Sequence, residues 1–167
     1  MIDGIFFFSD NDEATGAFGK CLARLLRPGM AVALTGDLGA GKTVFCRGVA
    51  RGFGVAGHIP SPTFTLVQEY PLADGNVLYH TDMYRIADEQ AALDFGIDEY
   101  LGNPRGISLI EWSERIDGLL DPRTTLRLDI RHQDETTRLL AFSNWPEELA
   151  AIPLPAGIRL CKDDQRI

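Results

Sequence analysis

The sequence predicts an α/β domain, and two features support this prediction. First, a glycine-rich segment at residues 36–43 follows an apolar run and precedes a stretch without proline, residues 44–53. This order is typical of a buried strand, a loop and a helix. Second, further strand-like and helical patterns follow one another along the rest of the chain. A sheet covered by helices accounts for both features.

The N-terminal elements are expected to be a strand and a helix. The apolar run at residues 5–8 is a strand candidate, and residues 11–26 carry apolar side chains at helical spacing. Pro28 and Gly29 end that pattern. Residues 30–34 then form the apolar run that we expect to be the buried strand before the glycine-rich segment.

The middle of the chain predicts a hairpin and a short helix. A loop rich in glycine and proline is expected at residues 52–62. Two strand-like runs follow, residues 65–70 and 76–80, and the Ala-Asp-Gly sequence at 73–75 between them is a hairpin signal. Residues 88–95 are expected to form a short helix.

The last third predicts one buried strand and a terminal hairpin. The strand is expected at residues 106–110, and the hairpin pairs 124–130 with 137–142. We expect residues 1–150 to form a single domain, because the chain length suits one compact core. Residues 151–167 are expected to be a C-terminal tail, and their prolines and charged end favour mobility.

Composition narrows the class of protein. The 167 residues contain no apolar stretch of about 20 residues, and the N-terminal apolar run has no basic flank, so neither a membrane span nor a signal peptide is expected. Cys21, Cys46 and Cys161 are odd in number and lack metal-ligand spacing, so we interpret the first two as small buried residues in a cytoplasmic protein. The formal net charge of −8 argues against direct nucleic-acid binding.

The glycine-rich segment matches the phosphate-loop pattern G-x-x-x-x-G-K-[ST] at every fixed position. It consists of Gly36, Asp37, Leu38, Gly39, Ala40, Gly41, Lys42 and Thr43. Glycines let backbone N–H groups converge on phosphate oxygens at a helix start. Lys42 can reach the β and γ phosphates, and the Thr43 hydroxyl can bind Mg²⁺. A chance match has a frequency of roughly one per cent, so we expect a nucleoside triphosphate site.

Two carboxylates close apolar strands. Glu111 follows the strand at residues 106–110 directly, as a Walker B acid does when it points toward Mg²⁺. Asp82 ends the run at residues 77–82 in the same way. Taken alone, each has an alternative of about equal weight: a cap or turn residue for Asp82, and a first-turn helix acid for Glu111.

A third segment could supply hydroxyl groups to the site. Residues 61–65 read Ser-Pro-Thr-Phe-Thr and follow the helix after the phosphate loop, where nucleotide switches place a hydroxyl near the γ phosphate. From these residues alone an ordinary turn is the preferred interpretation. His80 lies within a strand pattern, and no histidine cluster is present, so we interpret it as a packed or edge residue and not a metal ligand.

Four motifs together resemble one known family. They are the phosphate loop, Ser61-Pro-Thr-Phe-Thr-Leu66, Tyr79-His-Thr-Asp-Met-Tyr-Arg85 and Glu111-Trp-Ser-Glu-Arg115. In this order and at these separations they resemble the TsaE (YjeE) family, the bacterial ATPases of tRNA threonylcarbamoyladenosine synthesis. The resemblance runs to about Phe142. It implies a P-loop NTPase-like three-layer domain with a mixed parallel/antiparallel sheet, in agreement with the hairpins.

The resemblance also implies residue roles. Lys42, Asp82 and Glu111 correspond to the family's catalytic positions, and Thr43 and Glu111 to its Mg²⁺ positions. Nucleotide contacts are implied for the phosphate loop and for further positions: Asp12, Thr15, Thr63, Thr65, Asp82, Trp112 and Asp134. At the last of these the usual Gly-Arg pair is replaced by Asp134-Glu135, and Arg138 matches the arginine that follows it.

The activity implied by the resemblance is ATP hydrolysis that depends on partners. Proteins of the TsaB and TsaD type carry out the transfer to tRNA, so contact with tRNA is expected only through them. ATP is favoured over GTP because no Asn-Lys-x-Asp arrangement for guanine is present. Two alternatives use the same loop: a small P-loop kinase, although no acceptor site is evident, and a non-hydrolysing nucleotide sensor, which would not need Asp82.

Overall fold

The computed structural model describes residues 4–144 and 151–161. Its elements follow the order expected for alternating strands and helices. They are β1 (Ile5–Ser9), α1 (Asp12–Leu22), β2 (Ala31–Thr35), α2 (Lys42–Gly52), β3 (Val67–Pro71), β4 (Val77–Asp82), α3 (Glu89–Phe95), η1 (Ile97–Glu99), β5 (Gly106–Glu111), η2 (Ser113–Leu119), β6 (Thr125–His132), β7 (Arg138–Ser143) and β8 (Ile158–Leu160).

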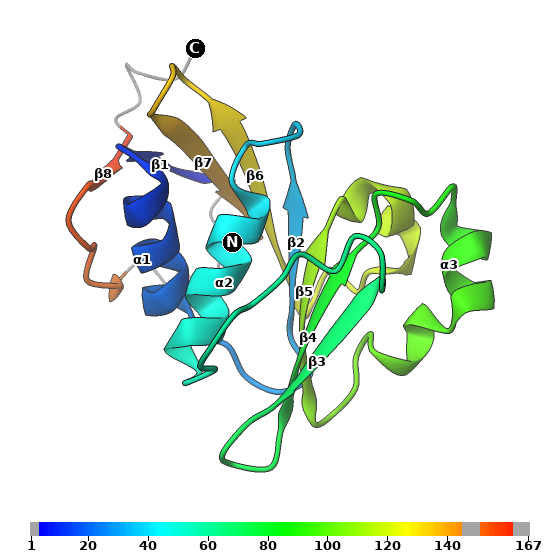
Figure 1. Ribbon diagram of the computed structural model, residues 1–167. Helices are drawn as coiled ribbons and strands as arrows, with labels where there is room; N and C mark the ends of the chain where they lie inside the picture. Colours follow the sequence, from blue (N-terminus) through cyan, green and yellow to red (C-terminus); the bar gives the residue numbers. More distant parts are fainter. Residues whose placement is uncertain (1–3, 145–150, 162–167) are drawn as a thin grey trace.

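The strands form one mixed sheet in the order β3-β4-β5-β2-β6-β7-β1-β8 (Figure 1). The central strands β4, β5, β2 and β6 run parallel, and the outer pairs are antiparallel. Both predicted hairpins are present, as β3–β4 and β6–β7. The predicted α/β class with a mixed sheet is confirmed.

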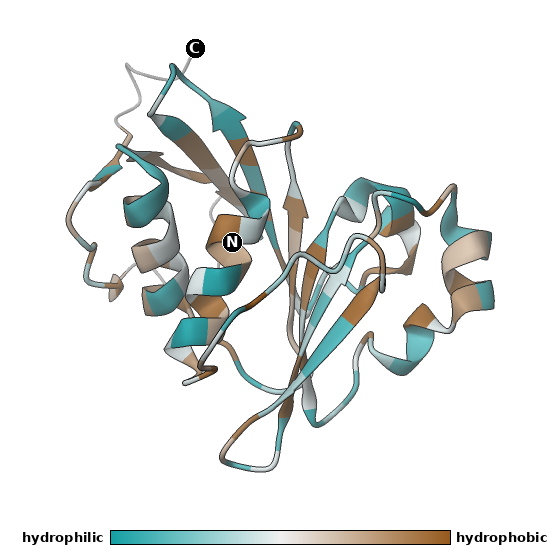
Figure 2. Ribbon diagram, in the orientation of Figure 1, coloured by the Kyte–Doolittle hydropathy of each residue, from teal (hydrophilic) through white to brown (hydrophobic). Residues whose placement is uncertain are grey.

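Helices cover both faces of the sheet, which gives three layers (Figure 1). On one face α1 and α2 pack on a core that includes Phe18, Leu34 and Phe45. On the other face α3, η1 and η2 enclose a smaller core around Met83 and Ile110. Figure 2 shows the apolar character of β2 between these layers. Because side chains alternate along a strand, β2 contributes to both cores.

The contact between α1 and α2 depends on glycines. A Cβ atom at Gly48 would lie 2.0 Å from the carbonyl oxygen of Gly16, and one at Gly19 would lie 2.4 Å from that of Phe45. The two helix backbones therefore approach too closely for any larger residue at these positions. This contact fixes α2, whose first turn carries Lys42, against the rest of the domain.

Element boundaries differ from the predictions for local reasons. The first helix ends at Leu22, and not near residue 26, because its last turn tightens into hydrogen bonds from Arg24 N to Cys21 O and from Leu25 N to Leu22 O. The strand predicted from residue 65 begins at Val67. Leu66, which precedes it, has a φ of 64° and belongs to a turn.

Three elements were not predicted. The 3₁₀ helices η1 and η2 follow α3 and β5. Strand β8 lies within the expected tail and pairs antiparallel with β1, with Ile158 opposite Ser9. The expectation of mobility also covers residues 162–167, which lie outside the described residues. Among the described residues, no helix has the length and apolar character needed to cross a membrane.

The glycine contact yields a stability prediction. Gly48→Ala forces α1 and α2 apart, so the free energy of unfolding should fall by about 1–3 kcal/mol, as overpacking typically costs. Gly16→Ala is the matched control, since its Cβ would meet Val44 at an ordinary 3.8 Å, and alanine favours a helix by about 0.5–1 kcal/mol. Urea unfolding of both variants measures this difference. A Gly48→Ala protein as stable as Gly16→Ala would contradict the close-packing argument.

Candidate functional site

The phosphate loop, residues 36–43, joins β2 to α2 at the carboxyl edge of the parallel strands. Gly36 and Gly41 adopt φ values of 130° and 112°, which favour glycine. A Cβ atom at Gly36 would lie 2.2 Å from the carbonyl oxygen of Ile130. The last two residues of the loop, Lys42 and Thr43, begin α2, where backbone N–H groups lack helical partners. The predicted strand–loop–helix unit is therefore present, with the geometry of an anion site.

Lys42 folds back onto the loop. Its Nζ donates hydrogen bonds to the carbonyl oxygens of Gly36 and Asp37, at 2.8 Å for the latter. The same ammonium lies 3.9 Å from the centre of the Trp112 ring, within cation–π range. Burial lowers the pKa of Lys42, and the nearby carboxylates, Glu111 foremost, oppose that shift. A positive charge is thus held beside the start of α2.

Trp112 lies directly after β5 in a strained conformation. Its φ of 57° and ψ of 41° fall in the left-handed region, which large residues rarely adopt. Its ring contacts that of Tyr84, with the ring centres 5.0 Å apart. The strained turn allows one residue to leave the strand and lie beneath Lys42, which is the kind of strain found at functional sites.

Parallel pairing brings Glu111 to the phosphate loop. Glu111 stands opposite Leu34 of β2 on one side and Asp82 of β4 on the other. Its Oε2 accepts a hydrogen bond from the Thr43 hydroxyl at 2.9 Å, and its Oε1 lies 2.7 Å from Nε2 of His80. Glu111 is thus a strand-terminal acid, not the first-turn helix acid of the alternative interpretation.

Asp82 connects residues 61–65, the hydroxyl segment, to the same edge of the sheet. Its Oδ2 accepts hydrogen bonds from Thr63 at 2.9 Å and from Ser61 at 3.4 Å. Its Oδ1 accepts the backbone N–H of Tyr84 at 2.9 Å. The turn interpretation of Asp82 is therefore also correct, because one oxygen orders the turn after β4. The other oxygen fixes the hydroxyl segment at the site.

These groups line one pocket of about 320 Å³. It is bounded by Asp12, Leu38, Gly39, Ala40, Gly41, Lys42, Thr43, Val44, Ser61, Thr63, Asp82, Tyr84, Glu111 and Trp112. The donor set fits a phosphate and Mg²⁺: helix-terminal N–H groups and an ammonium suit an anion. A hydroxyl and two carboxylates are the oxygen ligands that Mg²⁺ prefers. Tyr84 and Trp112 add aromatic surface to the pocket.

Other predicted site residues lie outside the pocket lining. Thr65 is exposed, and Thr15 is buried with its hydroxyl 2.7 Å from that of Ser9. Asp134 accepts the backbone N–H groups of Thr136 and Thr137, and so orders the turn between β6 and β7. Gly36 and Asp37, within the phosphate loop, contribute their carbonyl oxygens to Lys42.

Arg138 stabilises the phosphate loop. Its side chain is buried, and its Nε donates to the carbonyl oxygen of Ala40 at 3.2 Å. Its guanidinium also lies 3.8 Å from the carboxylate of Asp12, at the start of α1. The arginine therefore ties β7 and α1 to the phosphate loop.

The sequence does not predict the contact of His80 with Glu111 or the place of Tyr84 in the pocket lining. His80 was correctly expected to be packed, since its side chain is buried, but its contact with Glu111 was not expected. The period of two along β4 places His80 on the same face as Asp82, and this spacing was the available signal. Of the two cysteines expected to be buried, Cys46 is buried and Cys21 is only partly buried.

Comparisons with known proteins agree with this geometry. A family model described as threonylcarbamoyl adenosine biosynthesis protein TsaE matches residues 9–140. The tRNA threonylcarbamoyladenosine biosynthesis protein TsaE of Bacillus subtilis is 41% identical over 80% of this chain and 81% of its own length. Its counterpart in Haemophilus influenzae is 42% identical over 73% and 78% of the two chains.

A solved structure extends the likeness to three dimensions. The crystal structure of Bacillus subtilis YdiB superposes with a TM-score of 0.69 at 34% identity. The match covers 85% of this chain and 86% of that one. By sequence and by fold, this chain belongs to the TsaE family of threonylcarbamoyl adenosine biosynthesis proteins.

Proposed function

We propose that this protein binds and hydrolyses ATP with Mg²⁺ as a component of the machinery that makes threonylcarbamoyladenosine in tRNA. The observation that carries the proposal is the hydrogen bond from Thr43 to Glu111 at the head of the phosphate-loop helix. It joins the two residues that a P-loop ATPase uses for its metal. Membership of the TsaE family supports a role in threonylcarbamoyladenosine biosynthesis.

Different residues of the site bind the phosphates and the metal. Lys42 and the N–H groups at the start of α2 offset charge on the β and γ phosphates, and Thr43 and Glu111 hold Mg²⁺ directly or through water. When bound, the metal supplies further charge neutralisation at the phosphates. Lys42 must then exchange the carbonyl oxygens of Gly36 and Asp37 for phosphate oxygens.

Asp82 orients the attacking water. It is buried at the pocket wall and lies in register with Glu111, so its carboxylate faces the same space as the proposed metal position. Thr63 and Ser61 hold one of its oxygens and fix its direction. Such positioning contributes most of the catalysis in phosphoryl transfer.

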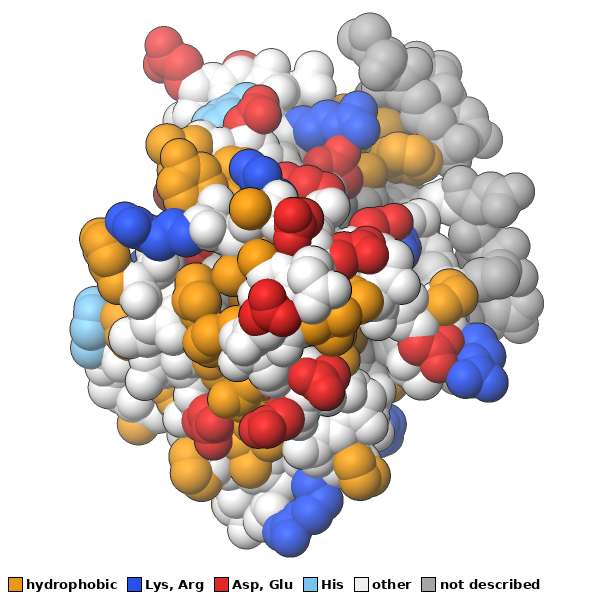
Figure 3. All heavy atoms as spheres, turned by 90° about the vertical axis from the view of Figure 1, so that its right-hand side faces the viewer, with side chains coloured by type: hydrophobic (Ala, Val, Ile, Leu, Met, Phe, Trp, Pro, Cys, Tyr) orange, Lys and Arg blue, Asp and Glu red, His pale blue; other side chains and the backbone are white. Residues whose placement is uncertain are grey.

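Partners of the TsaB and TsaD type complete the reaction in the cytoplasm, and tRNA is contacted only through them. The net charge of −8 disfavours independent RNA binding. Figure 3 shows acidic side chains gathered on the face formed by α3 and the neighbouring 3₁₀ helices. Exposed acids there include Asp88, Glu89, Asp94, Asp98, Glu99, Glu114 and Asp117.

Radiolabelled ATP tests the proposal and separates its competitors. The protein is incubated with γ-labelled ATP and Mg²⁺, alone and with a TsaB and TsaD pair. Free phosphate released mainly with the partners is the expected result. Label transferred to another molecule would indicate a kinase instead, and saturable binding without turnover would indicate a nucleotide sensor.

Removing the loop ammonium should weaken nucleotide binding. Lys42→Ala deletes a charged hydrogen-bond donor, and such bonds contribute about 1.5–3 kcal/mol. The dissociation constant for Mg·ATP, measured by calorimetry, should therefore rise about tenfold to a hundredfold. Lys20→Ala, an exposed lysine in the last turn of α1, is the control and should bind as the wild type does. Unchanged affinity of Lys42→Ala would place the phosphates elsewhere.

Neutralising Asp82 should separate binding from turnover. Asp82→Asn keeps the size of the side chain but removes the charge that orients water, so phosphate release with partners should fall by about 10²–10⁴-fold. Calorimetry should show Mg·ATP affinity close to that of the wild type. Asp98→Asn, an exposed acid in η1, is the control. Turnover of Asp82→Asn at the wild-type rate would remove Asp82 from this role.

A further inference from the structure

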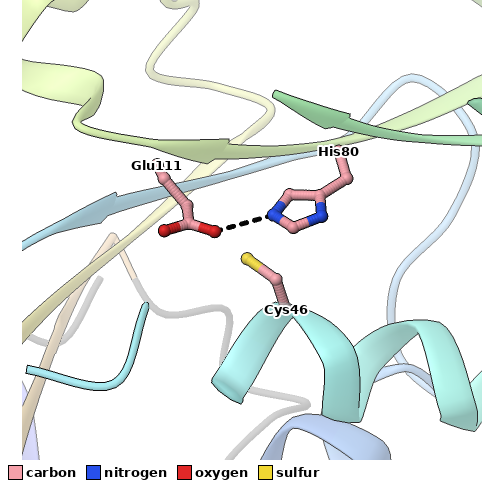
Figure 4. Close-up of side chains that lie close together, drawn as sticks. All are labelled: Cys46, His80 and Glu111. Carbon is pink, nitrogen blue, oxygen red and sulfur yellow. Dashed lines mark hydrogen bonds and ion pairs between the residues drawn. The ribbon is translucent and has the colours of Figure 1, made fainter. Parts of the chain in front are cut away.

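Three side chains with different ligand chemistry meet beneath the phosphate loop (Figure 4). Cys46 rises from α2 toward the sheet, His80 comes from β4 and Glu111 from the end of β5. One potential ligand atom from each lies within 4.8 Å of the other two. All three residues are buried, with at most 2% of their surface exposed.

The proposed ATPase chemistry uses only part of this cluster. Glu111 has a place in Mg²⁺ binding, and His80 contacts it, but the thiol of Cys46 takes no part. Burial raises the pKa of that thiol well above its usual value, and the charge of Glu111 adds to the shift. A cysteine binds a metal as the thiolate, so its proton must leave when an ion binds.

The ligand set selects a particular class of metal. A thiolate, an imidazole and a carboxylate are the ligands of zinc, and three protein ligands with one open position form a common zinc arrangement. Mg²⁺ avoids sulfur and nitrogen ligands. The Thr43 side of Glu111 therefore suits Mg²⁺, whereas the Cys46 side suits a softer ion.

The distances are close to those that zinc requires. Bonds of about 2.0–2.3 Å in a tetrahedron separate ligand atoms by roughly 3.3–3.6 Å. The present atoms, which lie within 4.8 Å of one another, would move together by up to about 1.2–1.5 Å, while the 2.7 Å contact between His80 and Glu111 would open slightly. Glu111 also lines the nucleotide pocket, which gives an ion a route to the cluster.

We propose that Cys46, His80 and Glu111 form a site for a thiophilic divalent cation of the zinc class, and that this cation competes with Mg·ATP. On binding, the thiol proton of Cys46 leaves to water and the ion replaces the contact between His80 and Glu111. The competition rests on the proposed function, because it requires Glu111 to serve Mg²⁺. Two dications sharing one carboxylate repel each other, so each should weaken the binding of the other.

Cobalt(II) chloride is the probe for the site itself. Cobalt replaces zinc and gives a near-ultraviolet thiolate-to-metal absorption band when bound to cysteine. The wild-type protein without nucleotide should develop this band to one equivalent per chain, and zinc should abolish it. Cys21→Ala/Cys161→Ala, which keeps Cys46 as its only thiol, should retain the band. Cys46→Ala should lose it.

The folding of each variant decides how the result is interpreted. Far-ultraviolet circular dichroism and thermal unfolding identify variants that remain folded. If Cys46→Ala does not fold, the single-thiol protein is compared with the same protein carrying His80→Gln, which should lose the band or bind cobalt much more weakly. A band that persists in folded Cys46→Ala, or no band in the wild type, overturns the proposal.

Competition is measured separately from nucleotide binding. Calorimetry without cobalt first establishes whether Mg·ATP binds, which tests the proposed function alone. Saturating Mg·ATP should then raise the cobalt concentration at half-saturation about tenfold, within the usual range of coupling between sites. If Mg·ATP binds and the cobalt midpoint does not move, the ion and the nucleotide do not share Glu111 and the competition is wrong. If Mg·ATP does not bind, the proposed function fails while the cobalt band still tests the cluster.

Discussion

The parallel register of β4, β5 and β2 is the constraint on which the site depends. It aligns Asp82 with Glu111 and Glu111 with Leu34, the second-to-last residue of β2 before the phosphate loop. Because parallel strands end at the same edge, three segments far apart in the chain deliver their polar groups to one place. Close packing of α1 on α2 then holds Lys42 and Thr43 above that edge.

The site consists of separate hydrogen-bonded groups of polar side chains in a largely buried environment. Glu111 accepts Thr43 on one oxygen and contacts His80 with the other, and Asp82 is held by the hydroxyl segment. Buried polar groups without partners cost about 1–3 kcal/mol each, so these mutual contacts keep the folded protein stable before any ligand binds. Lys42 follows the same rule by donating to the carbonyl oxygens of its own loop. Ligand binding must therefore exchange contacts, not simply add them.

The sequence predicted local features well and long-range contacts poorly. The phosphate loop, both hairpins and the acids at strand ends follow from short patterns, in which glycine, apolar runs and turn residues act within a few positions. The contact of His80 with Glu111 and the approach of Cys46 depend on which strands become neighbours, and no single segment encodes that order. Strand β8 pairs with the edge of β1 that β7 does not occupy. Asp134, for which a nucleotide contact is predicted, uses its carboxylate to cap its own turn.

A crystal structure with Mg²⁺ and a non-hydrolysable ATP analogue tests the central claim most directly. The account predicts that Lys42 leaves the carbonyl oxygens of Gly36 and Asp37 for the β and γ phosphates. It also predicts that Mg²⁺ lies beside the Thr43 hydroxyl and the Glu111 carboxylate. Phosphates bound away from the start of α2, with no Mg²⁺ beside Thr43 and Glu111, would contradict it.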